Sequence, residues 1–186
     1  KKGGIKVHTN IHANEFVPSD IKFTSAATND SFMLKPANYN DGDIIAMDRA
    51  YIDYARFEEL TNRGVTYVTK MKKNLVYDTL SDTMYMLPCS LMECRVQVVE
   101  FRKHIKGGEN IKHKARIVTY VDPAKKKAKV ISLLTNDMTM EVEDIIDIYR
   151  QRWEIELLFK QLKQNFPLKY FYGESANAIK IQIWVT

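Results

Sequence analysis

The sequence contains little cysteine. Its two cysteines, Cys89 and Cys94, are five positions apart, and the 186 residues contain no Cys-x-x-Cys pair. Disulfide frameworks and structural zinc sites need recurring cysteine pairs, so both kinds of site are disfavoured and a reducing compartment is indicated. We expect both cysteines to be ordinary packing residues.

Several other signals are missing. No apolar run approaches the ~18 residues that a membrane-spanning helix needs, and no signal peptide opens the chain. The chain has no initiator Met and ends in an apolar stretch, so we expect a fragment of a longer protein. It also lacks a Gly-rich phosphate loop, a Gly-x-Ser-x-Gly elbow and a His-Glu-x-x-His pair. These absences disfavour a small-molecule α/β enzyme.

Charge is distributed unevenly. The net charge is +5, yet residues 95–129 hold 11 Lys or Arg and 3 Asp or Glu, a local net of +8. The segment includes three consecutive lysines, Lys125, Lys126 and Lys127. Such a segment favours a polyanionic partner, although a solvated basic surface is the common alternative. The composition leaves both interpretations open.

The order of apolar runs predicts an α/β core. Two β-rich runs in residues 5–24 predict a hairpin in which Pro18 indicates an edge or a bulge. The run "IIAMD" predicts a buried strand that ends at Asp48. A helix over residues 52–63, ended by Gly64, and the strand "VTYVTKMKK" follow. This strand–helix–strand order predicts two parallel strands.

The rest of the chain predicts a different pattern. Residues 75–135 contain short β-type runs separated by turns, which predicts an antiparallel β-rich insertion that includes the basic segment. From Glu141 to about Gln164 the pattern is helical, and a last helix is predicted to begin near Ser175.

One stripe of the long helix stands out. At about 100° per residue, Tyr149, Arg152, Glu156 and Lys163 fall within roughly 60° of arc. Apolar positions flank the stripe on both sides, so it is expected to face protein or a cleft. A simple Arg152–Glu156 pair at i, i+4 is one explanation. Alternatively, Glu156 binds a divalent metal ion while Arg152 and Lys163 hold phosphates and Tyr149 binds a phosphate or orients Glu156.

A metal site needs a second acid, and Asp48 offers one. Asp48 follows the carboxyl end of a predicted strand, where α/β folds place their sites. The alternative is that Asp48 caps the helix that follows. Both interpretations of Asp48 stay open on the residues alone.

The pattern Tyr-x2-Arg-x3-Glu-x6-Lys at these four positions resembles the YREK signature of DDE transposases from bacterial insertion sequences of the IS-four type. Residues 47–74 resemble the block around that family's second catalytic aspartate. The runs "IKVHTNIH" and "LLTND" also resemble family blocks, in the right order, so the resemblance covers nearly the whole chain.

The resemblance implies an RNase H-like mixed sheet with flanking helices, interrupted by the β-rich insertion. Residues 1–74 would be the first part of that core, 75–137 the insertion and 138–186 the helical part with the motif. Asp48 and Glu156 would be catalytic metal ligands for two Mg²⁺ or Mn²⁺ ions. Tyr149, Arg152 and Lys163 would contact phosphates, and Lys125, Lys126 and Lys127 are further candidates for binding DNA.

The resemblance also implies the wider biology. The partners would be double-stranded DNA at the transposon ends and the target, with no membrane, a homodimer in the full-length synaptic complex and a cytoplasmic, nucleoid-associated location. The family's first aspartate precedes the hairpin, so we expect it to be absent here and the fragment alone to be inactive. The alternative is a noncatalytic DNA-binding or assembly module derived from a transposase. An upstream strand aspartate in the parent reading frame would distinguish the two.

Overall fold

The computed structural model describes residues 4–184 apart from 14, 16, 88–91, 105–107, 123–128, 166–172 and 174. The side chains at 17, 19, 158, 162, 163, 176, 183 and 184 also lie outside the description. Residues 29–150 form one compact unit, and residues 1–28 together with 151–186 form another.

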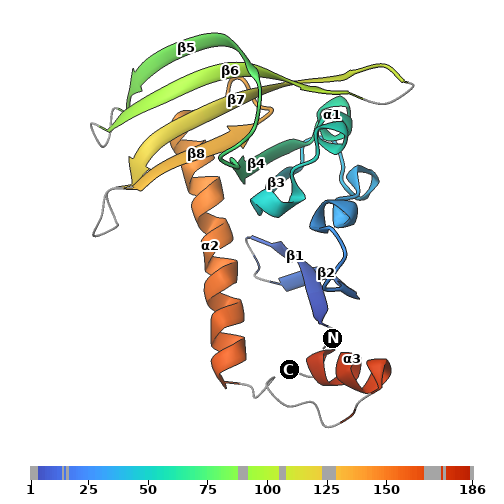
Figure 1. Cartoon of the computed structure of the whole chain (residues 1–186). Coiled ribbons are helices and arrows are strands. Elements are labelled where there is room, and N and C mark those ends of the chain that lie inside the picture. The colour runs from blue at the N-terminus through green and yellow to red at the C-terminus, as the bar shows by residue number, and fades with distance from the viewer. Residues whose placement is uncertain are drawn as a thin grey trace. The chain divides into compact units, whose positions relative to one another are not determined.

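The unit of residues 29–150 is built on a six-stranded mixed sheet (Figure 1). The strand order is β3-β4-β8-β7-β6-β5. The bounds are β3 Ile44–Met47, β4 Thr66–Lys70, β5 Asp78–Met86, β6 Glu93–Lys103, β7 Ile111–Asp122 and β8 Lys129–Thr135. β3 and β4 are parallel, and every other neighbouring pair is antiparallel. The predicted parallel pair and the predicted antiparallel run are both confirmed.

The antiparallel strands continue the sheet of the parallel pair. Residues Val68 and Thr69 of β4 pair with Thr135 and Leu134 of β8. The last strand of the predicted insertion therefore lies directly beside the core strand. The domain boundaries predicted at residues 74 and 137 stay a prediction, and the compact units divide the chain at other positions.

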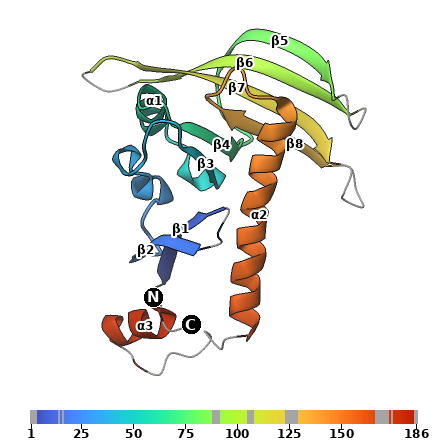
Figure 2. The ribbon, with the colours of Figure 1, turned by 180° about the vertical axis from the view of Figure 1, so that it is seen from behind.

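Helices cover both faces of this sheet. α1 (Tyr54–Asn62) packs on one face, where Phe57 and Leu60 join the cluster that contains Tyr67, Phe101 and Ile117. The first turns of α2 (Val142–Asn165) supply a second cluster on the other face, with Val68, Val118 and Leu133 from the strands. Figures 1 and 2 show α1 and the start of α2 beside the strands in opposite views. Ile117 and Val118 are adjacent in sequence and both buried because the two faces are covered.

Local capping explains where α1 begins and ends. Three short 3₁₀ turns precede it, at Asp30–Met33, Pro36–Asn38 and Arg49–Tyr51. Asp53 caps α1, because its carboxylate accepts hydrogen bonds from the amides of Ala55 and Arg56. The predicted helix therefore starts two residues later than its apolar pattern indicated. Gly64 ends it with φ = 71°, in the left-handed region that favours glycine.

The other unit contains a two-stranded antiparallel hairpin, β1 (Ile5–His12) with β2 (Val17–Ser25). Its register shifts between Asn10 and Ile11, and Ile11 pairs with Pro18. The predicted irregularity at Pro18 is thus confirmed, since proline cannot donate to a regular ladder. The unit also holds the part of α2 from Gln151 onward and α3 (Ala176–Trp184). Among the described helices, none combines the length and the apolar character of a membrane span.

Candidate functional site

The four positions of the predicted stripe all lie in α2, so their helical placement is confirmed. Tyr149 belongs to the unit of residues 29–150 and is only 3% exposed. It packs in the apolar cluster formed by Val142, Ile145 and Ile146 of α2 with strand residues of the sheet. Tyr149 thus contributes to folding, whatever further role its hydroxyl has.

Arg152 and Glu156 form the ion pair that their spacing allows. The Arg152 Nη1 atom lies 2.9 Å from Glu156 Oε1, and the side chains are 11% and 50% exposed. The guanidinium is largely buried while half of the glutamate side chain stays accessible. The pair agrees with a structural role and equally with a glutamate whose charge and orientation a cation holds. The Lys163 side chain lies outside the described residues.

Asp48 follows β3 and caps the 3₁₀ turn Arg49–Tyr51. Its Oδ1 atom accepts a hydrogen bond of 2.8 Å from the amide of Ala50. The sequence offered Asp48 as the cap of the helix that follows, whereas Asp48 caps this short turn and Asp53 caps α1. A carboxylate has two oxygens, so capping through Oδ1 does not by itself exclude metal binding.

A tyrosine and a second aspartate share the surroundings of Asp48. Burial, followed by the charges of Asp30 and Asp48 and by neighbouring Tyr39, raises the pKa of Tyr51 to about 12. Tyr51 therefore stays protonated at neutral pH. This grouping has no signal in the sequence, because Asp30 precedes Asp48 by 18 positions and no local pattern links the two turns.

Asp48 and Glu156 belong to different units, so the predicted convergence of their carboxylates stays a prediction. Their donor atoms suit the group that the resemblance implies, because Mg²⁺ and Mn²⁺ prefer carboxylate oxygens. Within the described residues, no group of three or more His, Cys, Asp or Glu side chains is gathered for a metal ion.

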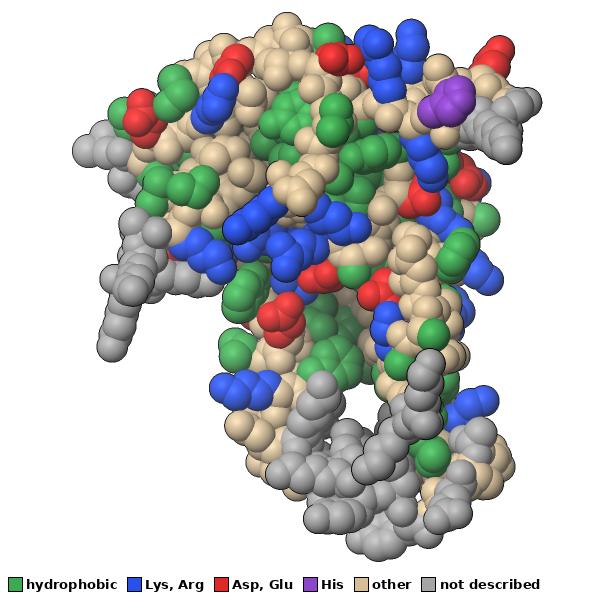
Figure 3. Space-filling model, in the orientation of Figure 1, with side chains coloured by type: hydrophobic (Ala, Val, Ile, Leu, Met, Phe, Trp, Pro, Cys, Tyr) green, Lys and Arg blue, Asp and Glu red, His purple; other side chains and the backbone are tan. Residues whose placement is uncertain are grey.

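Most of the basic segment is described, although Lys125, Lys126 and Lys127 lie outside the described residues. Arg95 pairs with Asp82, Arg102 with Asp78 and Glu100, and Lys103 with Asp53. Lys112 and Lys114 on β7 are exposed. In Figure 3, Lys and Arg side chains lie among acidic and hydrophobic side chains on the visible face of the sheet. The local net charge of this segment is thus partly offset by Asp78 and Asp82 on β5 and by Asp53 at the start of α1.

Comparison with known families decides the assignment. The family model of the transposase DDE domain matches residues 1–186, the whole chain. The chain belongs to this family. The mixed sheet with helices on both faces is consistent with the RNase H-like fold expected of DDE transposases.

Curated relatives of this DDE family member carry transposase names. The chain is 24% identical, over 97% of its length and 50% of the relative's, to a protein of Sinorhizobium fredii named as transposase y4zB. A protein of Geobacillus stearothermophilus, named as the transposase of insertion sequence element IS5377, is 23% identical to the chain. That match covers 99% of the chain and 47% of the relative. A protein of Synechocystis named as the transposase of element IS4SA is 28% identical over 77% of the chain and 38% of its own length. The chain spans about half the length of the first two relatives.

Proposed function

We propose that this chain is part of the catalytic core of a DNA transposase of a bacterial insertion sequence, of the IS-four type. The intact protein would cleave DNA strands and transfer them to a target. The observation that carries the proposal is the formed Arg152–Glu156 pair, at 2.9 Å, on the helix that bears the complete four-residue motif. The family match over the whole chain supports it.

Asp48 and Glu156 would hold the divalent ions of the active site through carboxylate oxygens. When bound, Mg²⁺ or Mn²⁺ lowers the pKa of an attacking water and stabilises charge on the leaving oxygen. Arg152 would orient Glu156, and with Lys163 it would offset the charge of the DNA phosphates. Tyr149 would anchor the helix on the sheet, and its hydroxyl is the candidate phosphate contact.

The chemistry would be two phosphoryl transfers. In cleavage, the oxygen of water bonds to phosphorus and the 3′ oxygen of the strand leaves and takes up a proton. In strand transfer, the freed 3′ hydroxyl loses its proton, attacks a phosphodiester of the target and displaces that strand's 3′ oxygen. Each step forms one phosphorus–oxygen bond and breaks one, so no oxidant or further cofactor is needed.

The partners would be double-stranded DNA at the element's ends and target, with two copies of the intact protein in the synaptic complex. Asp48 and Glu156 supply two carboxylates, where the family signature has three acidic residues. We therefore expect a polypeptide of residues 1–186 alone to hold two ions poorly and to leave DNA uncut.

Metal-dependent cleavage by the intact protein tests the proposal. The substrate is DNA that carries the segments flanking the protein's own reading frame. We expect nicks with free 3′ hydroxyl ends in Mg²⁺ or Mn²⁺ and none after EDTA treatment. Binding of this DNA with no cleavage under any divalent ion would instead favour the noncatalytic DNA-binding or assembly module.

The basic segment gives a second expectation. If Lys125, Lys126 and Lys127 follow the DNA backbone, replacing all three with Ala should flatten the slope of log K against log salt by up to ~3 units, because each phosphate contact contributes about 0.9. Fluorescence anisotropy of a labelled duplex at several salt concentrations measures the slope. The matched control replaces Lys72 and Lys73, which are exposed and lie outside the segment. An unchanged slope in the triple variant would remove these lysines from the DNA path.

A further inference from the structure

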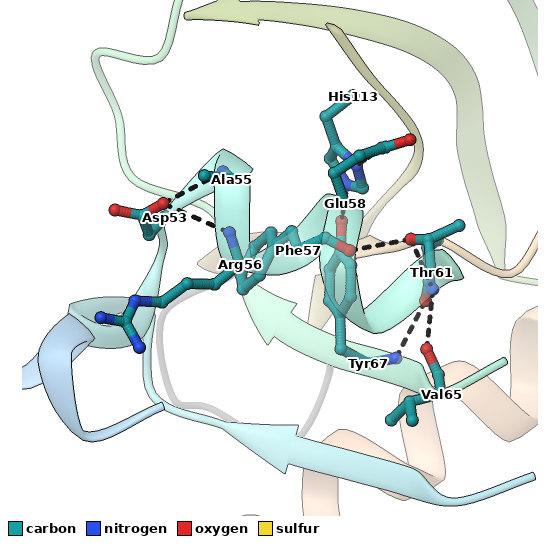
Figure 4. Close-up of polar contacts among 10 residues, drawn as sticks. Asp53, Ala55, Arg56, Phe57, Glu58, Thr61, Val65, Tyr67 and His113 are labelled. Atoms are coloured by element: carbon teal, nitrogen blue, oxygen red, sulfur yellow. Dashed lines mark hydrogen bonds and ion pairs between the residues drawn. The ribbon is translucent and has the colours of Figure 1, made fainter. Parts of the chain in front are cut away.

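A buried polar relay joins α1 to two strands of the sheet (Figure 4). The Tyr67 hydroxyl on β4 lies 2.6 Å from His113 Nε2 on β7. His113 Nδ1 lies 2.8 Å from Glu58 Oε2 on α1. Tyr67 and His113 are fully buried, while the Glu58 side chain is 36% exposed.

The chemistry of the three groups fixes the direction of both hydrogen bonds. An ionised carboxylate can only accept, so His113 Nδ1 carries a hydrogen and donates it to Glu58. In the neutral imidazole, Nε2 is then an acceptor, and the Tyr67 hydroxyl donates to it. Burial lowers the pKa of His113 and outweighs the opposing effect of Glu58. Burial likewise raises the pKa of Tyr67, so the hydroxyl keeps its proton.

The relay lies inside the apolar core and is closed by an aromatic ring. The Phe57 ring stacks on Tyr67 with centroids 4.0 Å apart and tilts against His113 at 5.9 Å. Phe101 is the cross-strand partner of His113, so this pairing places an apolar ring, and not a titratable group, opposite the histidine. A donor or acceptor left unsatisfied at such a site costs much of its desolvation energy, which makes the arrangement of α1 on the sheet strongly specified.

Two more polar contacts hold the ends of α1 to the same sheet. At its start, Lys103 Nζ on β6 lies 3.2 Å from Asp53 Oδ2. At its end, the Asn136 amide donates to Thr61 Oγ1 at 3.0 Å and to the Val65 carbonyl at 2.8 Å, while its oxygen accepts from the Tyr67 amide at 2.9 Å. α1 is thus fixed at its start, middle and end, and of these contacts only the relay continues into a fully buried hydrogen bond, between His113 and Tyr67.

The segment between β3 and α1 carries Asp48. Met47, the last residue of β3, is in register with Thr69 of β4, and Asp53 caps α1 five residues after Asp48. The peptide from Asp48 to Asp53 therefore spans two anchors, the β3–β4 pairing and α1. Any movement of α1 across the sheet would shift one end of this short corner and the carboxylate within it.

We propose that Glu58, His113 and Tyr67 are positioning residues for Asp48. The relay locks α1 to β4 and β7, and α1 in turn fixes the corner that presents the Asp48 carboxylate. The relay's effect on catalysis rests on the proposed function of Asp48, whereas its effect on the corner does not. None of the three residues is expected to touch DNA or metal.

Hydrogen exchange in the intact protein tests the corner directly. The amides of Ala50 and Tyr51 bond to Asp48, the first to Oδ1 and the second to the carbonyl at 3.0 Å. Removing the Tyr67 hydroxyl in Tyr67→Phe is expected to lower the protection of both amides about tenfold or more, from the cost of an unsatisfied buried group. Glu58→Ala should act alike, and Glu58→Gln should restore most protection because its amide oxygen can still accept from His113. The matched control is Tyr54→Phe, a half-buried tyrosine on the same helix that stacks on Phe101.

The comparison amide is Val118, in the other core. Loss of protection at Val118 with unchanged Ala50 and Tyr51 would mean that the relay only stabilises the fold, which would overturn the proposal. If Tyr67→Phe does not fold, the comparison of Glu58→Ala with Glu58→Gln decides, because Glu58 is partly exposed and its replacement is better tolerated.

In cleavage assays, Tyr67→Phe should lower kcat with little change in KM for DNA. If Asp48→Asn leaves cleavage intact, the proposed function fails. The exchange result at Ala50 still decides whether the relay fixes the corner from Asp48 to Asp53.

Discussion

Replacing Glu156 with Gln is expected to reduce metal-dependent DNA cleavage by the intact protein about 10³-fold or more, as for removal of other essential catalytic groups. Gln has nearly the same size, and its amide oxygen can still accept from Arg152 Nη1, which lies 2.9 Å from Glu156 Oε1. The variant loses the negative charge of Glu156. That charge would offset the repulsion between the two divalent ions, and it would also balance the positive charge of Arg152. Single-turnover cleavage in Mg²⁺ measures the loss.

The matched control is Glu154→Gln, an exposed glutamate on the same helix that lies outside the motif. It removes the same charge from α2 and should leave cleavage within about twofold of the original, since surface charges contribute little to such sites. Thermal unfolding of both variants confirms that α2 is intact. If Glu156→Gln cleaved as well as the control, Glu156 would not be a catalytic ligand and the Arg152 pair would be structural.

Replacing Tyr149 with Ala is expected to destabilise the protein by about 3–5 kcal/mol, as for other buried aromatic residues. Tyr149 is 3% exposed and fills a cluster between α2 and the sheet. Its removal leaves a cavity in that cluster and loosens the helix that carries Arg152 and Glu156. Urea unfolding followed by circular dichroism gives the change in the free energy of unfolding.

Tyr149→Phe separates packing from a role for the hydroxyl. It keeps the ring, so the stability cost is expected to be about 0.5–1.5 kcal/mol, that of one hydrogen bond. Cleavage that falls far more than this cost explains would support the proposed phosphate contact. Cleavage that stays unchanged would assign Tyr149 to packing alone.

The sequence predicted the secondary structure well because each element has a local signal. Alternating apolar residues marked the strands, and the 3.6-residue period marked α2, which carries the full motif as expected. Gly64 ended α1 as expected, and Pro18 lies at the register shift of the hairpin. The start of α1 was two residues off, because Asp53 rather than the apolar pattern sets it.

The candidate site could be predicted only in part. The fixed spacing on one helix identified Glu156 and its ion pair with Arg152, since residues four apart on a helix must be neighbours. Asp48 became a candidate because it follows a strand. The competing cap interpretation holds only for the 3₁₀ turn Arg49–Tyr51, because Asp53 caps α1. Whether these two carboxylates meet stays a prediction, because 108 positions separate them and no local pattern fixes such a distance.

The sequence by itself thus determined the family, the element order and the face of α2 that carries the motif. Only the tertiary structure decided that Tyr149 is buried in a core, that β8 pairs with β4 and that His113 joins Glu58 to Tyr67. Glu58 and His113 are 55 positions apart, and Tyr67 and His113 are 46 apart. Local propensity and periodicity act over a few residues, whereas these contacts arise when strands distant in sequence pair and a helix packs across them.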